Sequence, residues 1–240
     1  MPRRPRLELP NVPLHIIQRG VNRCAVFIDC ADRRHYLRLL RTAAQDHGVA
    51  VHAYVLMGNH VHLLVTGQAV GSISSAMHWL GQCYVQAFNR SHRRTGTLWD
   101  GRFKSCLVDS DNYLLTVYRY IELNPVRAAI ADAPEKYAWS SAQGNLGFWS
   151  DPTLTPHPVF LALAADVKAR SRVYWHWLLQ GISSEELKAI RLHLQQEKAL
   201  GSERFRSMVR RTLNRDVSWR PPGRPKRSPI ERPPDLKAPA

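Results

Sequence analysis

The strongest constraint on the fold is one run in which two apolar stretches flank a turn: Tyr54-Val55-Leu56-Met57-Gly58-Asn59-His60-Val61-His62-Leu63-Leu64-Val65. Valine and leucine around Gly58-Asn59 predict a β-hairpin whose first strand covers residues 49–56. Alternate side chains of a strand share a face, so His60 and His62 stand side by side, about 7 Å apart at Cα. Buried imidazoles need polar partners or a metal ion. Two histidines can also share a strand by chance, so the pair alone leaves both interpretations open.

Periodicity elsewhere predicts alternating strands and helices. Gly48 stands where a C′ glycine ends a helix, Ser110 can cap a later helix, and Pro125 forces that helix to stop. The order β-α-β-β-α-β-α predicts the α+β class, with a ferredoxin-like split βαβ arrangement of an antiparallel sheet and packed helices. The expected elements outside the hairpin are strands at 12–19 and 99–108, the latter a strand or hairpin, and helices at 32–47, 73–90 and 111–123.

The helix expected at 111–123 carries the second informative pattern. At 3.6 residues per turn Tyr120 and Asn124 are neighbours on one face, which Tyr113 shares, whereas Tyr118 lies on another side. A tyrosine hydroxyl beside an amide oxygen is compatible with a nucleophile next to a metal ligand. It is also compatible with a half-buried tyrosine that an asparagine satisfies, and in isolation the pattern favours this second interpretation.

Charge indicates the class of partner. Lys and Arg number 34 against 19 Asp and Glu, a formal net charge of +15, which favours a polyanion such as nucleic acid. No apolar stretch is long enough to span a membrane and no signal-peptide core follows Met1, so we expect a cytoplasmic, nucleoid-associated protein without a membrane role. The scattered cysteines contain no C-x-x-C pair and predict neither a zinc ribbon nor a disulfide framework.

Together the two motifs resemble a known family. His60-Val61-His62 followed by Tyr120-Ile121-Glu122-Leu123-Asn124-Pro125-Val126-Arg127 is similar to the single-tyrosine transposases of the His-hydrophobic-His endonuclease superfamily, especially the REP-associated tyrosine transposases. The resemblance covers about residues 10–145, and the fold of that family agrees with the predicted order. It also includes Gln18-Arg19-Gly20-Val21-Asn22-Arg23, Gly58 to Val65, and Trp99-Asp100-Gly101-Arg102-Phe103.

The resemblance implies roles for individual residues. Tyr120 corresponds to the nucleophile, and His60, His62 and Asn124 correspond to the ligands of a divalent metal ion, Mg²⁺ or Mn²⁺. It implies cleavage and rejoining of single-stranded or hairpin DNA through a 5′-phosphotyrosine, without a nucleotide cofactor. Many relatives carry Gln, His or Glu at the third ligand position, so Asn124, a modest ligand, departs from the wider pattern. Tyr118 is the alternative nucleophile if the helix register differs.

Other residues of these elements receive secondary roles. His52 and Tyr54 lie on the first hairpin strand and face either the site or the core. Tyr113 is expected to pack or to stack on DNA, and Glu122 is expected to be solvated or to orient a hairpin. Basic residues near the motifs suit phosphate contacts as a cluster: Arg19, Arg23, Arg93, Arg94, Arg102 and Lys104.

The character of the chain changes after the expected catalytic domain at 1–148. Residues 149–200 predict a helical accessory region with helices at 160–179 and 183–200, and residues 201–240 predict a basic, proline-rich, disordered DNA-binding tail. Within the tail Pro222 to Arg227 resembles an AT-hook, which lays basic side chains in a narrow minor groove. Its basic residues are Arg224, Lys226 and Arg227, and a generic basic tail is the alternative.

Two classes of function remain. The first is a metal-dependent DNA strand transferase, and the second is a DNA-binding regulator or architectural protein on the same scaffold. The joint presence of His60, His62, Tyr120 and Asn124 favours the first, because a pure binding protein does not need them. Replication initiators and relaxases share the paired histidines, and a nickase of that kind is a further alternative. A monomer and a homodimer are equally compatible with the sequence.

Overall fold

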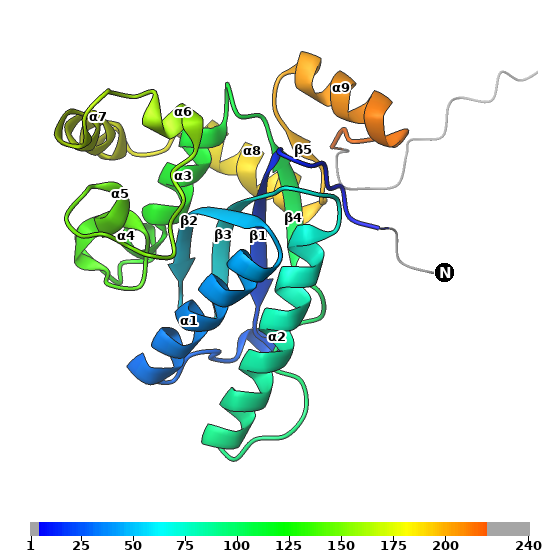
Figure 1. Ribbon diagram of the computed structural model, residues 1–240, viewed down its shortest axis with the longest axis vertical. Helices are drawn as coiled ribbons and strands as arrows, with labels where there is room; N and C mark the ends of the chain where they lie inside the picture. The colour runs from blue at the N-terminus through cyan, green and yellow to red at the C-terminus, as the bar shows by residue number, and fades with distance from the viewer. Residues whose placement is uncertain (1–4, 220–240) are drawn as a thin grey trace, which may run out of the picture.

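The computed structural model describes residues 5–219, so the AT-hook-like segment with Arg224, Lys226 and Arg227 lies outside the described residues. A five-stranded sheet with the order β2-β3-β1-β4-β5 forms the centre of the molecule (Figure 1). The pairs β1–β3, β1–β4 and β2–β3 are antiparallel, whereas β4–β5 is parallel. The strands are β1 Pro13–Arg19, β2 Val49–Leu56, β3 His60–Gly67, β4 Lys104–Val108 and β5 Ala199–Leu200.

Helices cover both faces of the sheet (Figure 1). Helices α1 (Cys30–Asp46) and α2 (Ser72–Ser91) pack on one face, and α3 (Leu114–Glu122) with α8 (Ser184–Gln195) packs on the other. This arrangement confirms the α+β prediction. The shorter or more peripheral helices are α4 Asn124–Arg127, α5 Ala142–Asn145, α6 Pro158–Leu161, α7 Val167–Leu179 and α9 Glu203–Leu213, with 3₁₀ turns at Val21–Arg23 and Pro134–Lys136.

Strand alternation divides the apolar residues between two cores. In β3, Val61 and Leu63 join the core under α1 and α2, whereas Leu64 joins the core under α3. His60 and His62 have the same parity as Leu64, so the period of two directs both imidazoles toward the α3 side. The predicted hairpin therefore places the two histidines beneath the helix that carries Tyr120.

Several element boundaries differ from the prediction. The strand expected at 99–108 is shorter, because β4 begins at Lys104. Helix α3 begins at Leu114 rather than at Asp111 and is not capped by Ser110, because the Asp109 carboxylate accepts hydrogen bonds from Asp111 N and Asn112 Nδ2 and holds this stretch in a turn. The helix predicted at 160–179 is split into α6 and α7. The helix predicted at 183–200 ends early, because residues 199–200 pair with β4 as strand β5.

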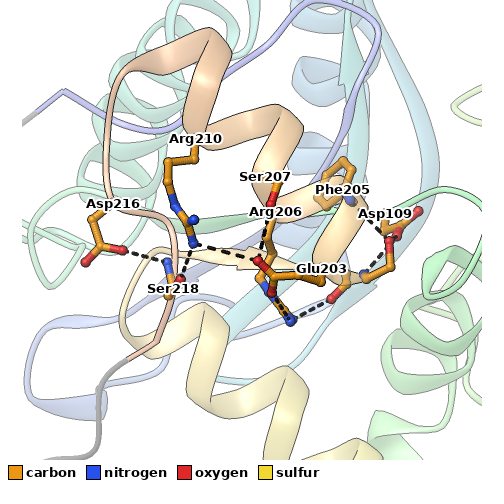
Figure 2. Close-up of polar contacts among 10 residues, drawn as sticks. Asp109, Glu203, Phe205, Arg206, Ser207, Arg210, Asp216 and Ser218 are labelled. Atoms are coloured by element: carbon orange, nitrogen blue, oxygen red, sulfur yellow. Dashed lines mark hydrogen bonds and ion pairs between the residues drawn. The ribbon is translucent and has the colours of Figure 1, made fainter.

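The prediction of a disordered tail is wrong for residues 203–213, which form α9. Ser202 caps this helix by accepting from Phe205 N, and Ser202 in turn donates to Asp109. Glu203 binds Arg206 one turn later (Figure 2). Val209 of the same helix is buried in the core. Composition correctly predicted that this segment is basic, but it did not reveal the apolar face of the helix or its capping residue.

Glu122 is also placed differently from the prediction. Its side chain is fully buried rather than solvated, and it accepts hydrogen bonds from Ser141 Oγ at 2.6 Å, Asn145 Nδ2 at 2.7 Å and Tyr174 Oη at 2.7 Å. Burial raises the pKa of Glu122, although the three hydrogen bonds act in the opposite direction. The carboxyl group thus ties α3 to α7 and to the segment that contains α5.

Replacing Glu122 tests this network. Glu122→Leu leaves three buried donors without their acceptor and should lower the free energy of unfolding by about 3 kcal/mol or more. Glu122→Gln retains an acceptor oxygen and should cost distinctly less. Urea denaturation of both variants measures the difference, and equal stability of Glu122→Leu and wild type would contradict the assigned role.

Candidate active site

A pocket of about 660 Å³ opens where the end of β1 meets the starts of β3 and β4. It unites the residues that the two sequence motifs predicted: His60 and His62 from β3, Tyr120 from α3, and Asn124 from α4. Ile17 supplies apolar lining. Residues about sixty positions apart in the sequence therefore share one cavity, as the motifs require.

His60 is held in one orientation by Asn59. The Asn59 amide donates through Nδ2 to the carbonyl oxygen of Arg23 at 3.3 Å, so its Oδ1 faces His60 Nδ1 at 2.7 Å. Because an amide oxygen only accepts, His60 Nδ1 carries the proton and Nε2 retains its lone pair. Burial and, to a smaller extent, the charge of Arg19 lower the pKa of His60 to about 4, so the ring is neutral near pH 7.

His62 is oriented by a residue that the sequence interpretation missed. His15 Nε2 and His62 Nδ1 lie 2.9 Å apart and share one hydrogen bond. Burial lowers the pKa of His15 to about 3, and burial together with His15 lowers the pKa of His62 well below its ordinary value. Both Nε2 atoms of the motif, on His60 and His62, have no hydrogen-bond partner within residues 5–219. The only sequence signal for His15 is a polar residue at a strand position of the same parity as Ile17.

Tyr120 is enclosed by rings and by a guanidinium. Its ring centroid lies 5.5 Å from those of both His15 and His62. The guanidinium carbon of Arg127 lies 4.5 Å from the ring centroid, and its Nη2 donates to the Tyr120 carbonyl oxygen at 2.9 Å. Tyr120 is 5% exposed and lines the same pocket as the two histidines.

The alternative tyrosines do not line this pocket. Tyr118 is fully buried and stacks on Phe160, with ring centroids 5.4 Å apart, and burial raises its pKa. Tyr113 precedes α3 at its N-cap and packs against the core beneath that helix. The helix register therefore favours Tyr120 over Tyr118 as the residue that faces the cavity.

Four of the six basic residues predicted near the motifs line the pocket: Arg19, Arg23, Arg102 and Lys104. Arg93 and Arg94 follow α2 and are not part of its lining, and the Arg94 guanidinium lies over the Phe88 ring. The pocket also contains Arg191 and Gln195 of α8, which no sequence motif indicated.

Gly20 permits the turn that brings Arg19 and Arg23 to the same pocket. A Cβ atom at Gly20 would lie 2.3 Å from the carbonyl oxygen of Cys24, a distance that no ordinary packing allows. The glycine is needed for this close approach of two backbone segments rather than for an unusual dihedral angle, because its φ is −64°.

His52 and Tyr54, whose orientation the sequence left open, point away from the pocket. A register shift in β2 lies between Val51 and Ala53, and His52 at this shift binds Thr155 O at 2.7 Å and Thr66 Oγ1 at 2.8 Å. Tyr54 donates to Asp151 Oδ2 at 2.7 Å within the core under α1. Neither residue contributes to the site.

Metal-binding capacity depends on Asn124. Within the part of the chain that the structure describes, no cluster of three or more His, Cys, Asp or Glu side chains could hold a metal ion. The pocket offers two neutral imidazoles with free Nε2 atoms and one amide oxygen, a donor set of the type that accepts a divalent cation. The residues present therefore fit a metal ion only if the amide takes part.

Comparison with known proteins identifies the domain. Residues 8–124 match the model of the family described as transposase, IS200-like. These residues belong to the IS200-like transposase family. The match ends at Asn124, so it includes every predicted ligand and Tyr120, and it confirms the recognition of a single-tyrosine transposase. At a coarse level the chain is thus a DNA-processing strand-transfer enzyme.

One solved structure supports the fold of this transposase. A REP-associated tyrosine transposase bound to a REP hairpin is 15% identical, with a TM-score of 0.51 over 65% of this chain and 93% of that chain, and it confirms the REP-associated type of fold. A candidate transposase from Deinococcus radiodurans R1 is 24% identical over 50% of this chain and 95% of that one, with a TM-score of 0.35. A search of curated proteins finds no match. None of the transposase's helices within residues 5–219 is long and apolar enough to cross a membrane.

Buried neutral histidines predict acid sensitivity of the transposase fold. Burial lowers the pKa of His52 to about 4, below the ordinary value of 6.5, so the unfolded chain binds a proton that the folded chain excludes. Stability is complete above pH 6.5 and is lost as the pH falls toward 4, by about 2 kcal/mol at pH 5 for this one residue. Urea titrations at several pH values should show a shallower decline for His52→Gln, and an unchanged slope would contradict the assignment.

Proposed function

We propose that the protein is a metal-dependent transposase that cleaves and rejoins single-stranded hairpin DNA through a 5′-phosphotyrosine on Tyr120. The observation that supports this most is the shared pocket of Tyr120, His60, His62 and Asn124. Four of the basic residues predicted near the motifs line the same pocket, Arg19, Arg23, Arg102 and Lys104, whereas Asp100 is the one carboxylate among the described residues that line it. This excess of positive charge favours entry of a phosphodiester.

His60, His62 and Asn124 would hold a divalent cation, Mg²⁺ or Mn²⁺. When bound, such a cation supplies Lewis-acid polarisation of a non-bridging phosphate oxygen and helps to align the scissile bond. Asn59 and His15 fix the two imidazole rings through their Nδ1 atoms, which leaves Nε2 of each ring for the cation. When Nε2 of His62 binds the cation, Nδ1 of His62 carries the proton. It then donates that proton to His15 Nε2, which fixes the orientation of the ring.

Tyr120 would attack the phosphorus atom through its phenolic oxygen. A new phosphorus–oxygen bond forms as the phenol gives up its proton to solvent, the bond from phosphorus to O3′ breaks, and the leaving 3′ oxygen takes up a proton from solvent to become a free 3′-hydroxyl. The positive charge of Arg127, stacked on the Tyr120 ring, favours negative charge on the phenolic oxygen during attack. The reverse attack of a 3′-hydroxyl on the phosphotyrosine rejoins DNA, so bond energy is conserved and no nucleotide cofactor is needed.

The hairpin preference is supported by the fold, since the structural relative is described as bound to a REP hairpin. On this proposal residues 1–148 carry the catalysis, residues 149–200 are accessory, and residues 201–240 add DNA contacts, including those of Arg224, Lys226 and Arg227. The protein would act on chromosomal DNA in the cytoplasm, and both a monomer and a homodimer are compatible with a site built within one chain.

A covalent-adduct assay tests the nucleophile. Wild type incubated with labelled hairpin oligonucleotides and Mg²⁺ or Mn²⁺ should give a protein–DNA adduct on a denaturing gel. Tyr120→Phe should abolish it, because Tyr120 is the one hydroxyl-bearing side chain among the described residues that line the pocket, whereas Tyr118→Phe should retain it. An adduct that persists in Tyr120→Phe would refute the assignment, and no wild-type adduct with any hairpin would favour a binding protein.

Calorimetric titration with Mn²⁺ tests the ligand set directly. His60→Ala and His62→Ala should each weaken binding at least about tenfold, because each removes one of three protein ligands. His52→Gln is the matched control, since His52 is a buried histidine of the neighbouring strand that does not face the pocket. Equal affinity of His60→Ala and wild type would show that the cation is held elsewhere.

A further inference from the structure

Helix α8 contributes to the pocket although it lies outside the family match. The match ends at residue 124, whereas α8 spans Ser184–Gln195. Nevertheless Arg191, Leu194 and Gln195 line the cavity that contains Tyr120. A segment without a family signature thus forms one wall of the site.

Helix α8 is fixed relative to the helix that carries Tyr120. Arg119, the residue before Tyr120 in α3, donates through Nη2 to Glu186 Oε1 at 2.9 Å, and the Arg119 side chain is only 5% exposed. Glu186 also completes a capping box with Ser183 at the start of α8. Ile190 is fully buried, so polar and apolar contacts hold the helix at a set distance from the nucleophile.

Arg191 and Gln195 lie on one face of this helix. They are four residues apart and therefore neighbours on successive turns, with both side chains exposed at the cavity. Within residues 5–219 the Arg191 guanidinium has no hydrogen-bond or ion-pair partner. Arg191 also lies close enough to Arg127 to contribute, after burial, to the lowered pKa of that guanidinium, and Arg127 stacks on Tyr120.

The positive charge of the pocket is largely uncompensated, because five cations line it: Arg19, Arg23, Arg102, Lys104 and Arg191. Asp100 is the one carboxylate among the described residues that line the pocket. Arg127 donates one hydrogen bond to the Tyr120 carbonyl oxygen, whereas every N–H donor of Arg191 is available to bind a ligand. A guanidinium with free donors beside a primary amide is well suited to a phosphate, whose non-bridging oxygens accept from both.

We propose that Arg191 and Gln195 form a phosphate-binding subsite that seats a DNA phosphodiester against Tyr120. The inference rests on the proposed function and adds to it a residue pair from the C-terminal part of the chain. Arg191 would donate to two phosphate oxygens and neutralise their charge, and Gln195 would donate one further hydrogen bond through its amide.

The salt dependence of binding tests the subsite without requiring chemistry. In a Tyr120→Phe background, the affinity for a fluorescent hairpin oligonucleotide with a single-stranded extension is measured across a series of KCl concentrations. Arg191→Ala should weaken binding at least about tenfold and reduce the slope of log K against log salt by about 0.7, as expected for one lost phosphate contact. Gln195→Ala should weaken binding with an unchanged slope, because a neutral amide releases no counterion.

Two further variants control for charge and folding. Arg191→Lys should retain the slope, because the positive charge remains. Arg172→Ala removes an exposed arginine of α7 that does not line the pocket, and it should change neither affinity nor slope. Thermal unfolding should be the same for Arg191→Ala and its parent, since Arg191 is exposed and unpaired. An unchanged slope in Arg191→Ala would overturn the proposal, whether or not affinity falls.

The covalent assay separates this proposal from the proposed function. With Tyr120 present, Arg191→Ala should form adduct at least about tenfold more slowly than wild type. If wild type forms no adduct but Arg191→Ala alters the salt slope, strand transfer fails while the phosphate subsite stands. If wild type forms adduct and Arg191→Ala forms it at the same rate with the same slope, the subsite fails while strand transfer stands.

Discussion

The site depends on strand β3, whose side chains alternate between the two faces of the sheet and whose register is set by pairing with β1 and β2. With both faces of the sheet covered by helices, a slip of one residue would exchange the apolar set of β3 with its histidines and bury His60 and His62 under α1 and α2. The pairing of Arg19 with His60 and of Ile17 with His62 fixes the opposite outcome. The apolar residues of β3 therefore specify the direction of the two imidazoles, although they take no part in chemistry.

Directing imidazoles into a core has a cost that the surrounding residues offset. Burial favours neutral rings, and each neutral ring still needs a partner for its proton. Asn59 supplies one for His60, and His15 shares a hydrogen bond with His62. These contacts leave one nitrogen of each ring facing the pocket. A buried neutral histidine needs a hydrogen-bond partner, and here the partners of Nδ1 also orient each ring. Packing and the proposed chemistry are thus connected, because the same contacts that make burial possible orient Nε2 of both rings for a cation.

The sequence was sufficient for features that depend on local pattern. The hairpin at Gly58-Asn59, the helix that ends before Gly48, and the shared face of Tyr120 and Asn124 follow from turn chemistry and helical spacing, and the structure agrees with each. Features that depend on contacts distant in the chain were missed. Glu122 was expected in solvent because its partners Ser141, Asn145 and Tyr174 cannot be identified from helix periodicity, and His15 and Arg191 carry no motif. Strand β5 is too short to have a pattern of its own.

Most of these missed contacts attach the C-terminal part of the chain to α3, the helix that carries Tyr120. Glu122 binds Tyr174 of α7, Arg119 binds Glu186 of α8, and β5 extends the sheet beside β4. Arg119 and Glu122 lie within two residues of Tyr120 in α3. The position of the tyrosine therefore depends on residues inside the family match, which ends at residue 124, and on residues of α7 and α8 beyond it. A truncated chain that ends near residue 148 would expose the buried carboxyl of Glu122 and remove the wall formed by α8. The proposed division into catalytic and accessory regions therefore reflects a change in composition along the sequence. The site itself is formed by residues of both regions.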